Sequence, residues 1–245
     1  MMRVDISWFV SGLRSVKADA YVVVDVLRFS TLVVTALSKG IEEIYVFADL
    51  KEAAEFSKYL KAPLAAEVDG IKPDLADLDN SPTGIADYVA LQGLGSGKLV
   101  VRTTSGALLV SEAIKLGLKD VFIGSLVNAA SIANILSSLK PSSVNIVCAG
   151  YRRRQFAIED FLGAGAITYE LSKLTDLSLG DEAIAATHAY ESVASKGKLL
   201  DVIKSGRGGN FLWNTGRDRD VVFASKVNTV DVVPKLFGRV IRRYK

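Results

Sequence analysis

Polar and charged residues follow several short Val-rich runs of the chain directly. Asp25 comes after the run 21–24, and Arg28 stands three positions further on. A carboxylate at the end of a strand can ligate magnesium, and an arginine can bind phosphate or a carboxylate in bidentate fashion. The structural alternative is an ion pair between Asp25 and Arg28, with Ser30 capping the helix that follows. The spacing alone is compatible with both interpretations.

A second polar cluster follows the run 99–101 and contains Thr103, Thr104, Ser105 and Gly106. It stands immediately before a helical pattern, where backbone N–H groups and the helix dipole attract an anion. The small residues would let a bound anion approach the backbone closely. Ordinary capping by Thr104 or Ser105, with nothing bound, is the alternative.

Acidic and amide residues recur at other turns and helix starts. Glu159 and Asp160 precede a helical stretch of small residues, where acids in the first turn are favourable in any case. Glu67 and Asn80 lie on turn-rich connections, and Asn80-Ser81-Pro82 has ordinary turn chemistry. Each of these signals therefore has a structural explanation when it is taken alone.

The elements that must position these residues alternate along the chain. Continuous β-branched runs predict strands that are covered on both faces, at 21–24, 44–47, 99–101, 121–123 and 144–147. Helical patterns lie at 31–39, 51–60, 108–116, 128–139 and 161–174. The alternation predicts an α/β fold, a layered α/β/α arrangement with a largely parallel or mixed sheet, and no linker divides residues 1–245 into two domains. Ligands of such sheets bind outside the carboxyl ends of the strands, so the polar loops are expected to converge there.

The chain also repeats itself weakly when it is shifted by 77 positions. Segments 22–46 and 99–123 then match, and both run strand, polar loop, apolar helix, helix-ending glycine and strand. The glycines suit a left-handed position at the end of a helix. Either a duplicated βαβ unit or the constraints of the architecture could produce these identities. Val23, Val24, Val33, Ala36 and Gly40 recur as Val100, Val101, Val110, Ala113 and Gly117.

Bulk composition limits the classes of partner. A net charge of +3 is too small to predict a nucleic-acid binder, and we expect none. The basic residues of the tail, Arg239, Arg242, Arg243 and Lys245, are interpreted as a solvated helix end. The single Cys148 excludes an internal disulfide and a cysteine-rich metal site. An acidic start and the lack of a long apolar run predict a cytoplasmic protein without a membrane partner. A homodimer stays open, because composition does not fix the oligomeric state.

Taken together and in order, these stretches resemble the 2-phosphosulfolactate phosphatase family. The resemblance extends from about residue 20 to about residue 235, and its most specific parts are the Asp-Val-Leu-Arg stretch from Asp25 and the Asn-Ser-Pro stretch from Asn80. The matching stretches are 24–31, 66–70, 80–82, 102–107, 124–129, 147–150 and 158–160. The resemblance implies magnesium-dependent hydrolysis of 2-phospho-3-sulfolactate, a small anionic substrate, to 3-sulfolactate, a step toward coenzyme M.

Three stretches depart from the family's pattern. The usual Thr-Thr-Asn-Gly-Thr loop is Thr-Thr-Ser-Gly-Ala at 103–107, and the usual Glu-Arg-Gly-Gly-like turn is Glu-Val-Asp-Gly at 67–70. The segment after Gly150, which normally contains glycine, is Tyr-Arg-Arg-Arg-Gln-Phe at 151–156. The acids and Arg28 are retained, so the departures concern the substrate rather than the metal-assisted chemistry. Another small phosphorylated hydroxy acid remains an alternative.

The resemblance and the residue types together give a candidate site. The metal is expected at carboxylates from the set Asp25, Glu67, Glu159 and Asp160. Arg28 would hold phosphoryl oxygens, and one acid with a raised pKa would protonate the leaving alkoxide. The catalytic set is Asp25, Arg28, Glu159 and Asp160, and the substrate-binding set is Ser30, Thr31, Asn80, Ser81, Thr103, Thr104, Ser105, Gly106, Asn128 and Gly150.

Two questions stay open at this point. The attacking group is water, Asp25 or Cys148. Asp25 does not begin an Asp-x-Asp pattern, because position 27 is leucine, and a buried structural thiol is the usual case for a cysteine such as Cys148. The rival to an enzyme is a protein that senses a phosphorylated metabolite with the same loops. Several carboxylates near an anion site argue against a pure binding protein. Arg102 and the run 152–154 are further cations for a substrate with more than one negative group.

Overall fold

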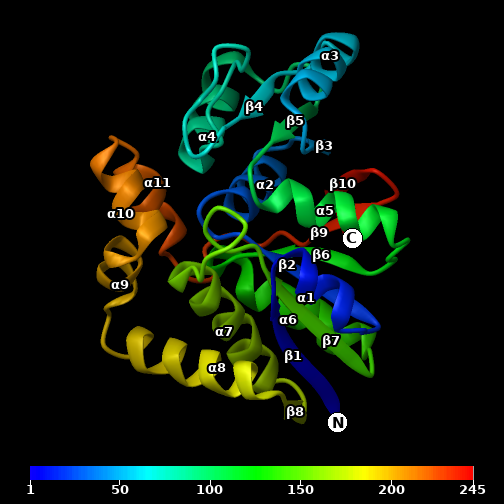
Figure 1. Cartoon of the computed structure of the whole chain (residues 1–245), viewed down its shortest axis with the longest axis vertical. Coiled ribbons are helices and arrows are strands. Elements are labelled where there is room, and N and C mark those ends of the chain that lie inside the picture. The colour runs from blue at the N-terminus through cyan, green and yellow to red at the C-terminus, as the bar shows by residue number, and fades with distance from the viewer. Residues whose placement is uncertain (245) are drawn as a thin grey trace.

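The computed structural model describes residues 1–244, and Lys245 lies outside the described residues. Ten strands form one sheet in the order β4-β5-β3-β10-β9-β6-β2-β7-β1-β8 (Figure 1). The strands are β1 Met2–Trp8, β2 Ala20–Val24, β3 Glu43–Phe47, β4 Leu64–Ala66, β5 Lys98–Arg102, β6 Val121–Gly124, β7 Ser143–Cys148, β8 Leu177–Leu179, β9 Pro234–Phe237 and β10 Val240–Arg243. The helices are α1 Phe9–Ser15, α2 Phe29–Ser38, α3 Leu50–Leu60, α4 Pro82–Gln92, α5 Gly106–Lys115, the 3-10 turn η1 Leu126–Asn128, α6 Ala129–Leu139, α7 Ile158–Ser172, α8 Asp181–Ala194, α9 Leu199–Ser205, α10 Arg207–Asn214 and α11 Asp218–Ala224.

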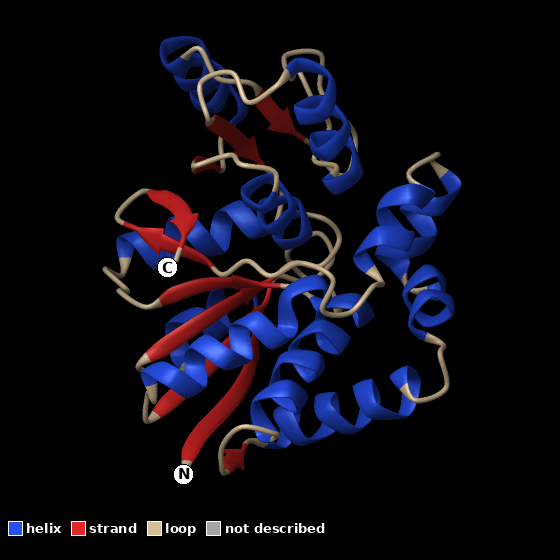
Figure 2. Cartoon of the chain, turned by 180° about the vertical axis from the view of Figure 1, so that it is seen from behind, coloured by secondary structure: helices blue, strands red, loops and turns tan. Residues whose placement is uncertain are grey.

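The sheet consists of two parallel blocks with a hairpin between them. Strands β4, β5 and β3 form one block, and β6, β2, β7, β1 and β8 form the other. The hairpin β9–β10 pairs antiparallel with β3 on one side and with β6 on the other. These three antiparallel pairings make the two blocks run in opposite directions. The predicted α/β fold with a mixed sheet is confirmed, and Figure 2 shows the hairpin between the smaller upper block and the larger lower one.

The continuous apolar strands are buried on both faces, as their composition predicts. Every residue of β2 is buried. Val22 and Val24 pack in one core with residues of α6 and α7, whereas Tyr21 and Val23 pack in a second core with residues of α1, α2 and α5. Side chains of a strand alternate between faces, so the two cores lie on opposite sides of the sheet.

The interpretation of the basic tail as a helix end is wrong. The residues from Val240 to Arg243 form β10, which pairs with β3 and β9. Val240 and Ile241 are buried, and the guanidinium of Arg242 pairs with the carboxylate of Glu43. Two apolar residues and their ladder partners decide the local structure, and Arg242 and Arg243, which follow them directly, are exposed.

The internal repeat has a structural counterpart. A shift of 77 positions carries α2 onto α5 residue for residue, and it carries β2 onto β5 and β3 onto β6 within one residue. Gly40 and Gly117 both adopt positive φ after their helices, as predicted. Strand β2 pairs with β6, and β3 pairs with β5, so each unit contributes one strand to each block. The loops that follow β2 and β5 are therefore equivalent positions of the two units.

Within residues 1–244, none of the helices combines the length and the apolar character needed to cross a membrane.

Candidate active site

A cavity of about 70 Å³ lies where loops of the two blocks meet. From the larger block come the loops after β2 and β7 and the start of α7, and from the smaller block come the loops after β4 and β5. Helix α10 covers a further side. The lining residues are Asp25, Leu27, Arg28, Glu67, Asp69, Gly70, Asn80, Thr103, Thr104, Ser105, Gly150, Tyr151, Arg152, Ala157, Glu159, Asp160, Gly208, Phe211 and Leu212. The structure thus brings the four predicted acids and Arg28 around one cavity.

Asp25 lies between the starts of two helices. Burial, followed by the charges of Glu67 and Glu159, raises the pKa of Asp25 to about 7. The backbone N–H groups of Phe29 and Gly106, the first residues of α2 and α5, act in the opposite direction. A Cβ at Gly106 would lie 2.9 Å from Oδ2 of Asp25 and 2.3 Å from the ring of Phe29. Glycine is therefore the residue that lets the equivalent helix starts approach each other at this carboxylate.

Glu159 is buried and incompletely hydrogen-bonded. Burial raises its pKa to about 7. Its Oε2 atom has no hydrogen-bond partner within the described chain. A Cβ at Gly208 of α10 would lie 2.2 Å from Oε1, so a side chain there would displace the carboxylate or the helix. The carboxylate is thus held against α10 with one oxygen available to a donor or a cation.

Glu67 and Asp160 use their carboxylates to hold loops. Glu67 accepts hydrogen bonds from the backbone of Gly70 at 2.7 Å, from Oγ1 of Thr104 at 2.9 Å and from the backbone of Thr104. Asp160 accepts one bond from Val26 and one from Gly150, each at 2.8 Å. Glu67 therefore joins the loops after β4 and β5, and Asp160 joins those after β2 and β7.

Cys148 is fully buried at the end of β7 and is not part of the cavity lining. Burial raises the pKa of its thiol well above the ordinary value, and its Sγ donates to the backbone oxygen of Asp160 at 3.6 Å. A nucleophilic cysteine needs the thiolate and access to the substrate. The geometry favours a structural thiol over the predicted alternative of a cysteine nucleophile.

Arg28 pairs with two acids that the sequence analysis did not include. Its guanidinium donates to both oxygens of Asp79 at 2.9 Å and to Asp220 at 3.0 Å, and its side chain is 2% exposed. The alternative of an Asp25–Arg28 ion pair is therefore wrong. Two carboxylates fix the guanidinium at the wall of the cavity, which makes it a rigid group rather than a free phosphate clamp.

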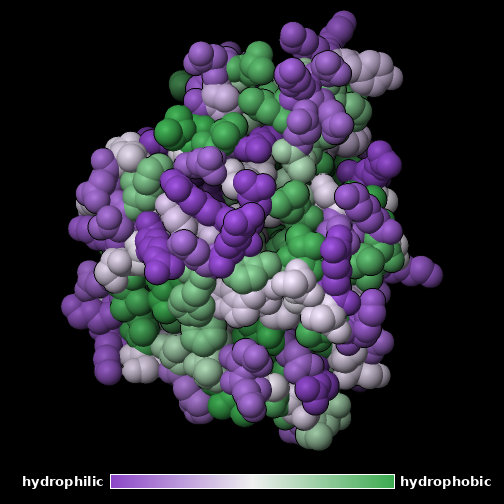
Figure 3. Space-filling model, viewed as in Figure 1, coloured by the Kyte–Doolittle hydropathy of each residue, from purple (hydrophilic) through white to green (hydrophobic). Residues whose placement is uncertain are grey.

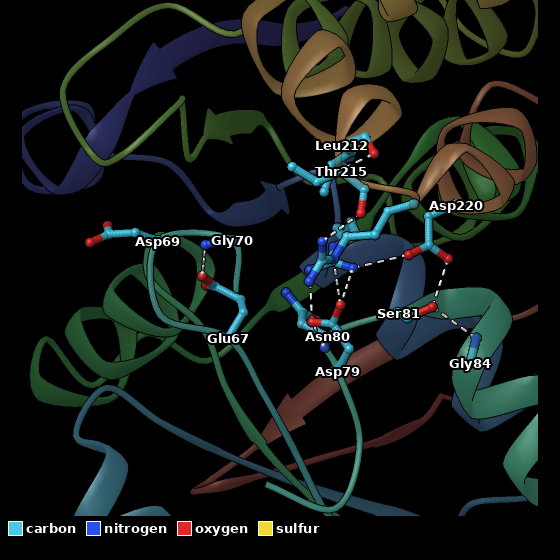
Figure 4. Close-up of polar contacts among 12 residues, drawn as sticks. Glu67, Asp69, Gly70, Asp79, Asn80, Ser81, Gly84, Leu212, Thr215 and Asp220 are labelled. Carbon is cyan, nitrogen blue, oxygen red and sulfur yellow. Dashed lines mark hydrogen bonds and ion pairs between the residues drawn. The ribbon is translucent and has the colours of Figure 1, made fainter. Parts of the chain in front are cut away.

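The same network extends to the Asn-Ser-Pro turn and to the C-terminal helices. Asp220, near the start of α11, accepts a hydrogen bond from Oγ of Ser81 at 2.7 Å (Figure 4). It also accepts one from Oγ1 of Thr83 at 2.7 Å, and Arg217 donates to Asp79 at 2.8 Å. Asp220 follows a run of alternating charges that is typical of an exposed helix start. Its contact with Arg28 joins residues 192 positions apart, and no local pattern signals it.

Five of the predicted substrate-binding residues line the cavity: Asn80, Thr103, Thr104, Ser105 and Gly150. The hydroxyl of Ser105 accepts a bond from the backbone of Arg153 at 3.2 Å and does not cap α5. Gly106 follows directly at the helix start. The structure places the others outside the lining, where their hydrogen bonds connect parts of the protein: Ser30, Thr31, Ser81 and Asn128.

The donor atoms of the cavity fit a hard divalent cation. Across residues 1–244 no three acidic, histidine or cysteine side chains are grouped at metal-ligating spacing. However, two buried oxygens of the lining lack any partner, Oδ1 of Asn80 and Oε2 of Glu159. Amide and carboxylate oxygens are the ligands that magnesium prefers. Five acids against two arginines in the lining also leave an excess of negative charge that a cation would neutralise.

Comparisons with known proteins give one consistent family. The family profile described as 2-phosphosulpholactate phosphatase matches residues 11–238. A probable 2-phosphosulfolactate phosphatase of Carboxydothermus hydrogenoformans is 32% identical over 235 residues, which cover 96% of this chain and 93% of that protein. Proteins with the same description from Caldanaerobacter subterraneus subsp. tengcongensis and Thermus thermophilus are 32% and 31% identical, over 94% and 98% of this chain and 92% and 95% of their own lengths.

Proposed function

The chain belongs to the 2-phosphosulfolactate phosphatase family and is a phosphoric monoester hydrolase, and we propose that it converts 2-phospho-3-sulfolactate to 3-sulfolactate and phosphate with the help of magnesium. The observation that supports this most strongly is the meeting of Asp25, Glu67, Glu159 and Asp160 with the hydroxyl loop of β5 around one cavity. We further propose that the reaction serves coenzyme M biosynthesis.

Two residues are the first candidates for holding magnesium. Glu159 supplies a carboxylate oxygen and Asn80 supplies an amide oxygen, and neither atom has a hydrogen-bond partner within the described chain. Bound there, magnesium would polarise the phosphoryl oxygens and activate a water. Glu67 and Asp160 are less suited, because the hydrogen bonds that hold the loops already occupy their oxygens.

The start of α5 is suited to the phosphoryl group. Thr103 and Ser105 line the cavity just before this helix. The positive end of the helix dipole attracts an anion at the same place. Arg28 forms a fixed part of the cavity wall, because its two carboxylate partners hold the guanidinium and compensate its charge. The hydroxyl loop and the start of α5 would bind the non-bridging oxygens and orient phosphorus.

Proton transfer is assigned to Asp25, since the free oxygen of Glu159 makes Glu159 the better metal ligand. Burial and neighbouring charges raise the pKa of Asp25 to about 7, so near neutral pH its carboxyl group can take up or release a proton. Asp25 would accept the proton of an attacking water and pass it to the leaving alkoxide, or it would attack phosphorus itself. A trapped aspartyl phosphate would show that Asp25 attacks phosphorus.

The proposal is tested by phosphate release from 2-phospho-3-sulfolactate with and without magnesium. We expect turnover only with the metal, and a rise of the melting temperature of the wild-type protein with magnesium alone. Glu159→Gln should lose both effects, whereas Asn210→Ala, an exposed position on α10, should keep both. Tight binding of the ester without any phosphate release would favour a sensor, and full activity in a chelator would contradict the role of magnesium.

A further inference from the structure

Arg28 and Arg152 are the two cations that line the cavity. The charge of Arg28 is shared between Asp79 and Asp220. Arg152 forms no ion pair with the acids of residues 1–244, and its guanidinium lies 5.3 Å from the centroid of the Tyr151 ring. Arg152 is therefore the cation of the lining whose charge remains available to a ligand.

The backbone at Arg152 is held in an unusual conformation. Tyr151 and Gln155 pair through two backbone hydrogen bonds, and the turn between them carries Arg152 and Arg153 at φ values of 47° and 67°. Non-glycine residues rarely adopt left-handed conformations, and here two adjacent ones do so. The loop between β7 and α7 lies on the near face of the molecule in Figure 1. In the same view, Figure 3 shows hydrophilic residues near the middle of this face.

Three neighbouring elements fix this turn at the edge of the cavity. The backbone of Arg153 donates to Oγ of Ser105 at 3.2 Å, and Gly150 donates to Asp160 at 2.8 Å. The side chain of Arg207, at the start of α10, donates to Oε1 of Gln155 at 3.2 Å. The turn thus keeps a fixed position relative to the hydroxyl loop, α7 and α10.

The size of the cavity indicates where the rest of a substrate lies. Pockets that enclose a whole ligand have volumes of roughly 300 Å³ or more, whereas this cavity has about 70 Å³. Only the reacting phosphoryl end would fit inside. The other anionic groups must lie at the opening, where a cation without an ion-pair partner would bind them.

We propose that Arg152 is a specificity-determining residue that binds the second anionic group of the substrate, a carboxylate or a sulfonate, at the opening of the cavity. This inference rests on the proposed phosphatase function. It assigns Arg152 a role in binding the non-reacting part of the ester and none in the transfer of phosphorus.

Arg153 offers a matched control. Arg152→Asn and Arg153→Asn each remove one charge from the same turn, and asparagine tolerates the left-handed conformation. Arg152 lines the cavity, whereas Arg153 lines a separate hollow with Phe9 and Leu108. Arg152→Lys keeps the charge. Melting temperatures of all three variants should stay close to that of the wild type.

The measurement is kcat and KM for four esters: 2-phospho-3-sulfolactate, phospholactate, a phosphoester with a sulfonate alone, and isopropyl phosphate without a second anion. We expect Arg152→Asn to raise KM about tenfold or more for the anionic esters, because a charge-assisted hydrogen bond is lost. The KM for isopropyl phosphate should not change. Arg152→Lys should recover part of the loss, and Arg153→Asn should stay within about twofold of the wild type for every ester. A larger effect on phospholactate identifies the carboxylate, and a larger effect on the sulfonate ester identifies the sulfonate.

Two results would overturn the inference while the proposed function stands. The first is an equal loss for isopropyl phosphate and the anionic esters, and the second is an equal effect of Arg152→Asn and Arg153→Asn. If the wild-type protein releases phosphate from none of the four esters with magnesium, the proposed function fails, and the inference fails with it.

Discussion

The carboxyl group of Glu159 makes folding dependent on pH. Its pKa is about 7 in the folded protein and about 4.5 as an ordinary glutamate. Between these values the folded protein holds a proton that the unfolded chain has released, so the free energy of unfolding falls as the pH rises through this window. Above about pH 7 the ionised, buried group costs on the order of 3 kcal/mol of stability.

Glu159→Gln tests this linkage in protein from which divalent ions have been removed. The neutral amide has nearly the same shape, so the variant should be more stable than the wild type by up to about 3 kcal/mol at about pH 8. The difference should vanish toward about pH 4, where both side chains are neutral. Urea unfolding across this pH range measures it. A difference that does not vary with pH would contradict the assigned cause.

Besides Glu159, the geometry of the site depends on Gly208. A Cβ there would lie 2.2 Å from Oε1 of Glu159, so Gly208→Ala must displace either the carboxylate or α10. We expect kcat to fall by about 100-fold, because small misplacements of reacting groups cost about that much. The control Asn210→Ala changes an exposed position of the same helix. Wild-type kcat in Gly208→Ala would show that Glu159 needs no fixed position.

At the scale of the elements, buried charges connect segments that are far apart in the chain. Arg28 at the start of α2 contacts Asp79 before α4 and Asp220 in α11. Without Asp220, Arg28 would keep only Asp79 as a partner, and the hydroxyls of Ser81 and Thr83 would lose their acceptor, which is strongly destabilising in a buried network. Asp220→Ala should therefore lower the free energy of unfolding by about 3 kcal/mol.

An exposed pair of the same two helices serves as the control for Asp220→Ala. Asp87 of α4 pairs with Arg219 of α11, and both side chains are more than half exposed. Asp87→Ala should cost less than about 1 kcal/mol, because solvent screens such pairs. Denaturant unfolding measures the free energy of unfolding of the two variants. Equal losses would show that the buried network contributes little to stability.

The sequence predicted the elements that carry their own periodicity. Strands β2, β3, β5, β6 and β7 and the main helices were expected close to their observed positions, and the polar residues after β2, β5 and β7 do meet. The hairpin β9–β10 was not predicted, because its basic residues resemble a helix end and its pairing partner β3 lies about 195 positions earlier in the chain. Asp79, Asp220 and Gly208 were missed for the same reason, since their roles depend on contacts between distant segments.

At the scale of the whole molecule, the hairpin joins the two blocks of the sheet. Strand β10 pairs with β3 and β9 pairs with β6, and these pairings connect the two blocks within the sheet. The candidate active-site cavity lies where the loops of the two blocks meet. The integrity of this site is therefore expected to depend on a hairpin that is remote from the proposed catalytic residues in sequence.

A chain that stops before Pro234 tests this dependence. It should lose its cooperative thermal transition and its activity, because the inner edges of both blocks would be left unpaired. Gly238→Asn is the control, since Gly238 has a φ of +62° with open space around it and asparagine tolerates that conformation. The control should fold with a change of about 1 kcal/mol or less. A folded, active truncated chain would show that helix packing alone holds the blocks together.

The order of the strands also has a consequence for the nascent chain. The ribosome adds about 5–20 residues per second, so roughly ten to forty seconds pass between the synthesis of β3 and that of β10. During this interval β3 and β6 present open edges, which invite pairing with other polypeptides. A chaperone that covers such edges would be needed most before β9 and β10 have emerged, and hydrolytic activity is expected only after these two strands have paired.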